Sequence, residues 1–218
     1  MILQLKITLA DSKPAIWRRI SIPSDYSLHA LHHAIQSSFD WFNGHLHQFY
    51  SPRSGLYSLP EDFMELMSDK LDLLPIQLDD PVVETTWDEK PVVDSRSAAI
   101  STCLEMEGDE MLYTYDFGDN WEHIIVVEKI FPIGPTLPVL MAGENQRPPE
   151  DCGGIDAFKG ALKLLKKKKK SDDDLEEIEM VFGDDWEDFD PKEFDLADHA
   201  KALQSKFLEA TEHEAKDT

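Results

Sequence analysis

The chain has 218 residues, with 21 Lys and Arg against 44 Asp and Glu, and therefore a formal net charge of −23. This charge argues against general affinity for DNA or RNA, because phosphate backbones are neutralised by lysine and arginine. A hydrophobic content of 41% excludes a wholly disordered chain. The sequence contains no run of about 18 apolar residues, the length that a transmembrane helix needs, so we expect no membrane span. The two cysteines, Cys103 and Cys152, are too few for a secreted disulfide scaffold, so we expect reduced thiols in a cytoplasmic protein.

The negative charge is concentrated at the C-terminal end of the chain. Residues 171–218 hold 18 acidic residues and four lysines, which is more than half of the net charge. We therefore predict a domain over residues 1–170. An acidic helical extension over residues 171–218 is expected to pack on that domain or to complete it.

The first half of the chain predicts a hairpin, a helix and a strand. Residues 3–9 alternate apolar and polar side chains, as in a strand with one buried face, and residues 15–22 follow a turn as its partner. Ser27 is a suitable N-cap for a helix that runs to about Asp40. Its apolar stripe consists of Leu28, Leu31, Ile35 and Phe39. Residues 45–50 predict a third strand.

The middle of the chain predicts short helices at 61–69 and 94–107, and a clear hairpin after them. Its strands cover 111–117 and 121–130, on either side of Gly118-Asp119-Asn120. The second of these strands is apolar on both faces, which favours an interior position. Residues 132–154, with five prolines and four glycines, predict a loop.

Three helices are predicted to follow, at 155–170, 171–182 and 196–210. The element order favours an α+β fold, in which a mixed or antiparallel sheet built from hairpins packs on helices. The acidic helical extension ends this fold.

The histidines and acids of two segments are candidate metal ligands. His45 and His47 alternate on one predicted strand, so they share a face, and His123 lies on another strand. Carboxylates from the turn between the late strands would complete a site for a divalent cation. The candidate ligands are His45, His47, Asp116, Asp119 and His123. The structural alternative is that these side chains only pack and hydrogen-bond within the sheet.

A second set of side chains is a candidate for ligand binding. Residues 148–154 combine two carboxylates and a thiol on a loop, where sites are often found. We also predict that Asp116 is buried and paired with an arginine of the second strand, because an unpaired buried carboxylate is costly. The ligand-binding candidates are Arg18, Arg19, His32, Trp121, Glu150, Asp151 and Cys152.

The chain contains a set of motifs in a fixed order: WRRI at 17–20, LHHAIQ at 31–36, HLHQF at 45–49, YTYDFGDNWEH at 113–123, PPEDCGG at 148–154 and DP at 190–191. Together, over roughly residues 3–200, these motifs resemble a known family, the plasmid pRiA4b ORF-3-like proteins. The resemblance implies a compact α+β domain and no established activity. It also implies that some members travel as passenger genes of mobile elements or plasmids.

The standard catalytic fingerprints, such as GxxxxGK[ST], GxSxG and HExxH, are absent from this sequence. The sequence therefore favours a non-catalytic binding or adaptor module, whose partner would be a protein with a basic or mixed surface. No cofactor is expected. The alternative is a metal-dependent hydrolase that uses the histidine and aspartate candidates, with Glu150 or Asp151 as base. A DNA-acting protein ranks last, since only the lysines of 163–170 support it. No membrane association is expected.

Overall fold

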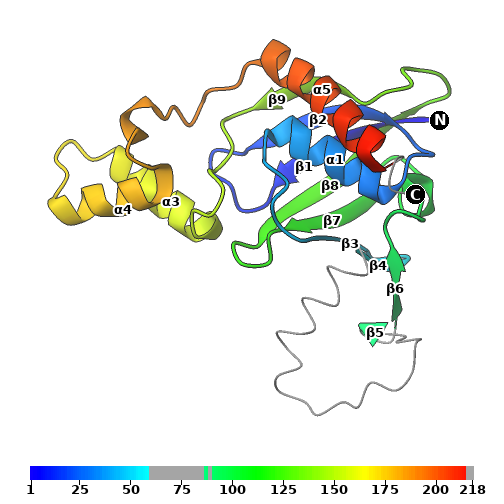
Figure 1. Ribbon diagram of the computed structural model, residues 1–218, viewed down its shortest axis with the longest axis horizontal. Coiled ribbons are helices and arrows are strands. Elements are labelled where there is room, and N and C mark those ends of the chain that lie inside the picture. Colours follow the sequence, from blue (N-terminus) through cyan, green and yellow to red (C-terminus); the bar gives the residue numbers. More distant parts are fainter. Residues whose placement is uncertain (59–85, 88–89, 215–218) are drawn as a thin grey trace.

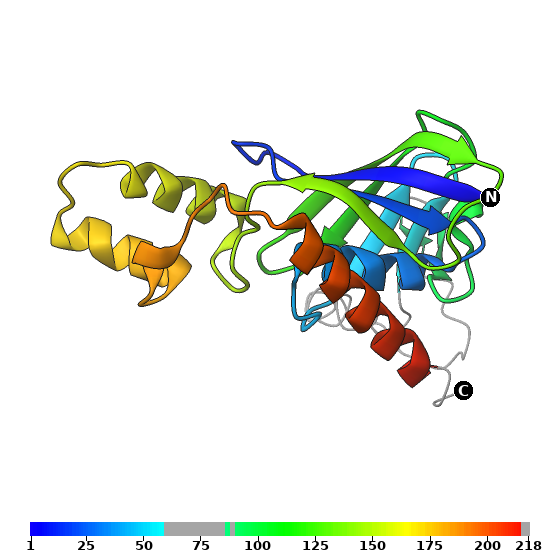
Figure 2. The same ribbon diagram turned by 90° about the horizontal axis from the view of Figure 1, so that it is seen from above.

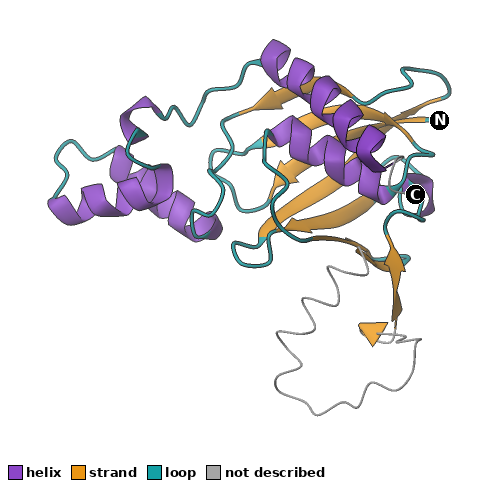
Figure 3. Cartoon of the chain, viewed as in Figure 1, coloured by secondary structure: helices purple, strands orange, loops and turns teal. Residues whose placement is uncertain are grey.

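The computed structural model describes residues 1–58, 86–87 and 90–214, and these form a mixed sheet with helices on one face (Figures 1, 2 and 3). Within the described residues the sheet has nine strands in the order β5-β6-β4-β3-β7-β8-β1-β2-β9. The predicted α+β class is confirmed. The strands are β1 Ile2–Leu9, β2 Trp17–Pro23, β3 His47–Ser51, β4 Gly55–Ser58, β5 Thr86–Trp87, β6 Lys90–Asp94, β7 Glu110–Tyr115, β8 Trp121–Phe131 and β9 Val139–Glu144. None of the helices among the described residues combines the length and the apolar composition that a transmembrane span requires.

The two predicted hairpins form the middle of the sheet. β1 pairs antiparallel with β2, and β7 pairs antiparallel with β8, which also pairs with β1. The interior position predicted for β8 is correct. Although this strand is apolar on both faces, one of the two faces is partly open to solvent, where Ile124 is 43% exposed. The sheet therefore buries one face and leaves the other open to solvent.

The first helix, α1 (Leu28–Phe39), lies on the buried face of the sheet. The side chain of Ser27 accepts a hydrogen bond from the Ala30 N–H, as a helix N-cap does. The helix ends at Asp40, whose left-handed backbone closes the last turn. The predicted apolar stripe is fully buried, so both the helix bounds and its orientation follow from the sequence.

Tertiary pairing changes several of the predicted elements. Residues 132–154 contain β9, which pairs with β2 at the edge of the sheet, because the prolines of this segment fall on either side of residues 139–144. The third strand begins at His47, so His45 precedes it. The helix predicted over 94–107 is only the 3₁₀ turn η1 (Ile100–Thr102). The helix predicted over 61–69 lies outside the described residues.

The last quarter of the chain forms a helical hairpin and a long helix. α3 (Gly154–Leu165) packs against α4 (Asp172–Phe182), and the pair projects away from the sheet, together with the 3₁₀ turn η2 (Trp186–Asp188) (Figure 1). The final helix, α5 (Leu196–Glu214), packs on α1 and β9. The predicted division of the chain at residue 170 stays a prediction.

The side chain of Arg18 is fully buried at the meeting point of several elements. Its Nε donates to the carbonyl of Ser38 at the end of α1, 3.0 Å away. Its Nη1 donates to the carbonyls of Trp17, Glu144 and Asn145, at 2.9–3.1 Å. The guanidinium also lies over the rings of Phe39 and Phe194, at 4.9 and 4.4 Å. Burial lowers the pKa of Arg18 to about 9.

The predicted pairing of Asp116 with an arginine of β2 is wrong. Arg18 bonds to backbone carbonyls, and the side chain of Arg19 points to the open face, where its Nη2 donates to Glu128 at 2.7 Å. The alternation of β2 places the two arginines on opposite faces of the sheet. Asp116 is buried, as predicted, but it has other partners.

We expect Arg18→Gln to lower the free energy of unfolding by about 3 kcal/mol, because several buried carbonyls lose their donor. The matched variant Arg19→Gln removes one half-buried ion pair and should cost less than about 1 kcal/mol. Urea unfolding of both variants measures the difference. Equal losses would contradict the central role of Arg18.

Three histidines lie in the core without charge. Burial lowers the pKa of His123 and of His47 to about 3, and it lowers the pKa of His32 well below the usual value. The rings of His32 and His47 stack with their centroids 3.6 Å apart. His123 lies edge-on to Phe39 and Trp41. Protonation of any of these rings would place a positive charge in an apolar environment.

Because the pKa values of these three histidines are lowered, we expect the folded protein to lose stability in mild acid. Below pH ~6.5 the unfolded chain binds protons that the folded chain does not, so stability is complete above that pH and falls as the pH is lowered towards 3. Each histidine contributes a slope of about 1 kcal/mol per pH unit. Urea unfolding between pH ~7 and ~5 measures this slope. His123→Gln should reduce it, and an unchanged slope in that variant would refute the account.

Candidate functional site

Three loops meet at the end of the sheet where β7 joins β8. They are the loop before β3, the turn of residues 116–120, and the loop of residues 148–153 that leads into α3 (Figure 1). The backbone N–H of Gly153 donates to Asp119 Oδ2 at 3.1 Å, which joins the last two of these loops. The HLH, DFGD and PPEDCGG motifs therefore lie together.

A histidine and three carboxylates form the centre of this site. His45 Nε2 lies 3.1 Å from Asp151 Oδ1, 3.7 Å from Glu150 Oε2 and 3.8 Å from Asp116 Oδ2. Ligand atoms of His45, Asp116 and Asp151 all lie within 4.8 Å of one another. The side chain of Asp151 is 74% exposed, so the group is open to solvent on that side.

The position of Asp116 depends on a left-handed backbone conformation. β7 ends at Tyr115, and Asp116 has a φ of 57°, a region that aspartate adopts more readily than most residues. Its Oδ1 accepts hydrogen bonds from the N–H groups of Gly118 and Asp119, at 2.9 and 3.3 Å. The turn therefore binds Oδ1 of Asp116, while Oδ2 remains available and faces His45. The strand alternation that we expected to continue through Asp116 ends one residue earlier.

Glu150 is held in place by two donors. The Phe42 N–H donates to its Oε1 at 2.6 Å, and the Tyr115 hydroxyl donates to its Oε2 at 3.0 Å. The Gly44 N–H in turn donates to the Tyr115 hydroxyl oxygen, 3.0 Å away. Burial and the neighbouring Glu150 raise the pKa of Tyr115, so its hydroxyl remains a donor. The sequence did not single out Tyr115, although it directly precedes Asp116.

Asp119 has a different role from Asp116. Its carboxylate accepts the Gly153 N–H at the start of α3, where a negative charge is favourable. It does not belong to the group formed by His45, Asp116 and Asp151. Gly154 lies so close to this turn that a Cβ there would stand 2.6 Å from the Asp119 carbonyl oxygen.

His47 and His123, which we predicted beside His45, lie apart from it. Both are buried in the core. The predicted alternation does not hold for His45 and His47, because β3 begins only at His47 and His45 lies in the loop before it. His32 is also buried, between the Tyr113 hydroxyl at 2.8 Å and Asn43 Oδ1 at 2.6 Å. Of the five candidate ligands, the structure brings together His45 and Asp116, and adds Asp151 to them.

The other ligand-binding candidates divide between core and site. Trp121 is buried in the core, and the two arginines of β2 have the partners described above. Cys152 is buried beside the site, and burial raises the pKa of its thiol to about 12, so the reactive thiolate is disfavoured. Glu150 and Asp151 are the two members of this set that lie in the cluster.

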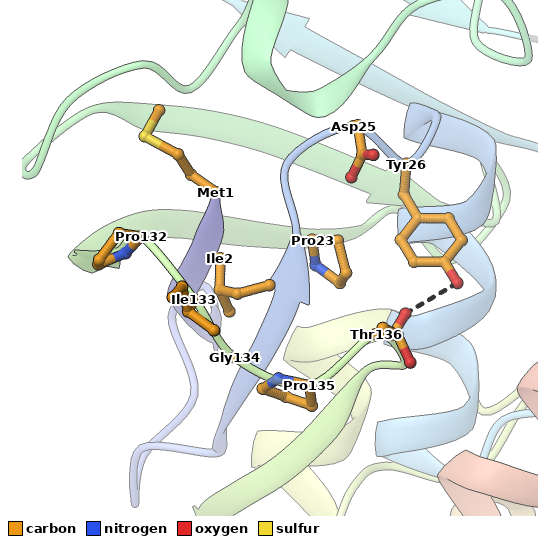
Figure 4. Close-up of a pocket in the computed structure, with 10 residues that line it drawn as sticks. All are labelled: Met1, Ile2, Pro23, Asp25, Tyr26, Pro132, Ile133, Gly134, Pro135 and Thr136. Atoms are coloured by element: carbon orange, nitrogen blue, oxygen red, sulfur yellow. Dashed lines mark hydrogen bonds between the residues drawn. The ribbon is translucent and has the colours of Figure 1, made fainter.

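A cavity of about 440 Å³ (Figure 4) lies beside the last residues of β8, at the end opposite the turn that carries Asp116. It is lined by the start of β1, the Pro23–Tyr26 turn and residues 132–136, and the Tyr26 hydroxyl donates to the Thr136 carbonyl at its edge. Asp25 is the one charged side chain among its lining residues. The cavity therefore has the volume for a ligand but few polar side chains, whereas the cluster around His45 groups an imidazole with three carboxylates.

The donor set of the cluster fits a divalent cation. One imidazole nitrogen with carboxylate oxygens suits Zn²⁺ or Mn²⁺, whose ligand atoms lie about 2.0–2.2 Å from the ion. The carboxylate oxygens lie 3.1–3.8 Å from His45 Nε2, near the separation of about 3–3.5 Å between neighbouring ligand atoms of one such ion. Solvent can occupy the remaining coordination positions on the exposed side of Asp151.

The close approach of Gly154 to Asp119 predicts a large effect of one added methyl group. Gly108 and Gly154 both have positive φ, but a Cβ at Gly108 would meet nothing within 4 Å. We expect Gly108→Ala to cost about 1–2 kcal/mol from its backbone alone. Gly154→Ala should cost at least about 1 kcal/mol more, because the start of α3 must move. Thermal unfolding compares them, and equal costs would contradict a tight junction.

Comparison with known proteins agrees with the motifs and with the fold. Residues 1–198 match the family described as Plasmid pRiA4b ORF-3-like protein. The chain is 30% identical over 154 residues to the uncharacterized protein y4hQ of Sinorhizobium fredii (strain NBRC 101917 / NGR234). This alignment covers 70% of this chain and 67% of that protein. It also resembles the crystal structure of the protein of unknown function MM3350 from Methanosarcina mazei Go1. That match has a TM-score of 0.67 and 32% identity, and it covers 90% of this chain and 95% of that one. The chain belongs to the plasmid pRiA4b ORF-3-like family.

Proposed function

We propose that the protein binds one divalent cation through His45, Asp116 and Asp151, and that it is a metal-dependent hydrolase. The observation that carries this proposal is the convergence of these three side chains from three separate loops, with their ligand atoms within 4.8 Å. Three carboxylates around one imidazole make a negative group that a dication would neutralise in large part. A bound divalent ion would lower the pKa of a coordinated water and so supply a nucleophile at neutral pH.

Glu150 is the group that would accept the proton of this water. Its two oxygens are oriented by the Phe42 N–H and by the Tyr115 hydroxyl, while Oε2 remains 3.7 Å from His45. A general base needs a fixed position within hydrogen-bond reach of the proton that it takes. Tyr115 acts through Glu150 and is therefore a positioning residue.

Metal binding is tested on protein without a histidine tag. Calorimetric titration with Zn²⁺ and with Mn²⁺ should give a stoichiometry of about one, and saturation should raise the melting temperature. His45→Ala and Asp116→Asn should each weaken binding by at least about 100-fold, because loss of a direct ligand costs more than loss of the outer-shell groups that orient it, which costs about 10–100-fold. Asparagine keeps the left-handed turn at residue 116, so the second variant tests the charge alone.

His199→Ala and Asp156→Asn are the matched controls, because they remove the same groups from α5 and from the surface of α3. Both should bind as the unmodified chain does. Absence of a stoichiometric metal and of any thermal shift would refute the proposal.

Hydrolysis is tested separately with Glu150→Gln. The amide keeps the hydrogen bond from Phe42 but cannot accept a proton, so metal affinity should change by less than about tenfold while any metal-dependent hydrolysis falls by about 100-fold or more. A panel of p-nitrophenyl esters and phosphates provides the substrates. Equal activity in Glu150→Gln would exclude Glu150 as the base. Metal binding without hydrolysis of any substrate in the panel would count against the hydrolase and leave the metal site standing.

A second candidate function is a non-catalytic binding or adaptor module. It is favoured by the charge of the segment that contains α4 and η2, since residues 172–195 carry thirteen acidic residues and one lysine. Such a surface attracts a protein partner with a basic or mixed surface, and the attraction should weaken as salt is added.

The two free, buried cysteines agree with a cytoplasmic location, and the family's description suggests a plasmid or mobile-element gene context. We therefore also propose a cytoplasmic location and a plasmid or mobile-element gene context.

A further inference from the structure

The helical hairpin of α3 and α4 has a small core of its own and an open groove beside it. The rings of Phe158, Phe182 and Phe189 meet in this core, and Phe182 and Phe189 stack with their centroids 4.3 Å apart. Beside them lies a groove of about 320 Å³ between the end of α3 and η2. It is lined by Leu162, Leu165, Lys166, Trp186, Glu187, Phe189 and Pro191. Most of this lining is apolar.

The rim of the groove is strongly acidic. Five of the seven residues from 184 to 190 are Asp or Glu, all five are exposed, and the other two are Trp186 and Phe189. None of these five carboxylates forms an ion pair with another residue of the described chain. Lys166 lines the groove and Lys170 lies near Trp186, so the rim also faces lysines. Residues 154–190 nevertheless carry 12 acidic residues against seven lysines, a net charge of −5, and this net field favours a cationic ligand.

The indole ring of Trp186 already has an ammonium group near its face. Lys170 Nζ lies 5.5 Å from the ring centroid, an arrangement that stabilises a cation over an aromatic ring. The groove thus combines an apolar floor, an aromatic ring that accepts a cation, and a rim of exposed carboxylates that form no ion pair within the described chain. Each of these features suits one part of an amphipathic basic peptide.

We propose that this groove is a docking site for a basic amphipathic segment of a partner protein. An apolar side chain of the segment would enter between Leu165 and Phe189. Its apolar face would pack on Trp186, and its flanking Lys or Arg residues would lie against the rim carboxylates. Nucleic acids and anionic membranes carry the wrong charge for this surface. The inference rests on the binding-module function and is independent of the metal site.

The test measures binding of fluorescein-labelled synthetic peptides to the full chain by anisotropy. The first peptide is an amphipathic helix of Leu and Lys, the second has the same composition in a scrambled order, and the third carries Glu in place of Lys. The first should bind about tenfold more tightly than the scrambled peptide, because only the amphipathic order presents an apolar face to the groove. The acidic peptide should not bind.

Two variants with the same change in net charge locate the site. The first neutralises the rim by Asp184→Asn, Asp185→Asn, Glu187→Gln and Asp188→Asn. The second neutralises four exposed acids elsewhere, by Asp25→Asn, Glu105→Gln, Glu107→Gln and Glu110→Gln. The rim variant should lose more than about tenfold in affinity and the other less than about threefold, because screening limits charges to short range. Trp186→Ala should also weaken binding, and Trp186→Phe should restore part of it.

Circular dichroism of each variant checks that the helices remain formed. Equal losses in the two fourfold variants, or equal binding of the ordered and scrambled peptides, would overturn the groove as the docking site while leaving a general acidic binding surface. Failure of the full chain to bind any basic peptide at low salt would overturn the docking site and the binding-module function together.

Discussion

The buried guanidinium of Arg18 is the interaction on which the arrangement of the fold depends. It binds backbone carbonyls of β2, of the end of α1 and of the end of β9, and it lies against Phe194 in the segment before α5. Hydrophobic burial alone would let these elements slide relative to one another. Directional bonds to several carbonyls fix their register. Gly143 is part of this arrangement, since a Cβ there would stand 2.5 Å from the Phe194 ring and 2.9 Å from Arg18 Cδ.

A second contact, between the β7–β8 turn and the start of α3, holds the loops of the candidate site in place. The turn between β7 and β8 holds the start of α3 through the Asp119 carboxylate and through the close approach of Gly154. The loop that carries Glu150 and Asp151 is thereby fixed at one end. Its other end follows β9, which is aligned by Arg18. Histidine and carboxylates from three loops can therefore keep defined separations although none of them lies within a strand or helix.

The negative charge of the chain has two different settings. At the sheet end, the carboxylates of Asp116 and Glu150 are held by backbone and tyrosine donors and surround one imidazole, an arrangement suited to a small cation. Beside the helical hairpin, the five carboxylates of residues 184–190 are exposed, form no ion pair within the described chain, and lie next to an apolar groove. A compact, oriented group favours a metal ion, whereas a broad field beside an apolar surface favours a larger basic ligand. The two proposed activities are therefore compatible in one molecule.

The sequence by itself determined the local elements. Side-chain periodicity and an N-cap serine gave α1 its bounds, alternation predicted both hairpins, and Ser171 with Asp174 gave α4 its capping box. The motifs also identified the family. These features depend on residues close together in the chain, whose interactions a local pattern contains.

The tertiary structure alone decided which residues meet. β9 was not predicted because its pairing with β2 outweighs a composition typical of loops. The left-handed backbone at Asp116 ended the expected alternation and turned its carboxylate towards His45 and away from the arginines of β2. His47 and His123 went to the core, and Asp151 joined His45 from a loop more than 100 residues away. Such contacts depend on strand order and on loop geometry over long separations, which no local pattern of residues encodes.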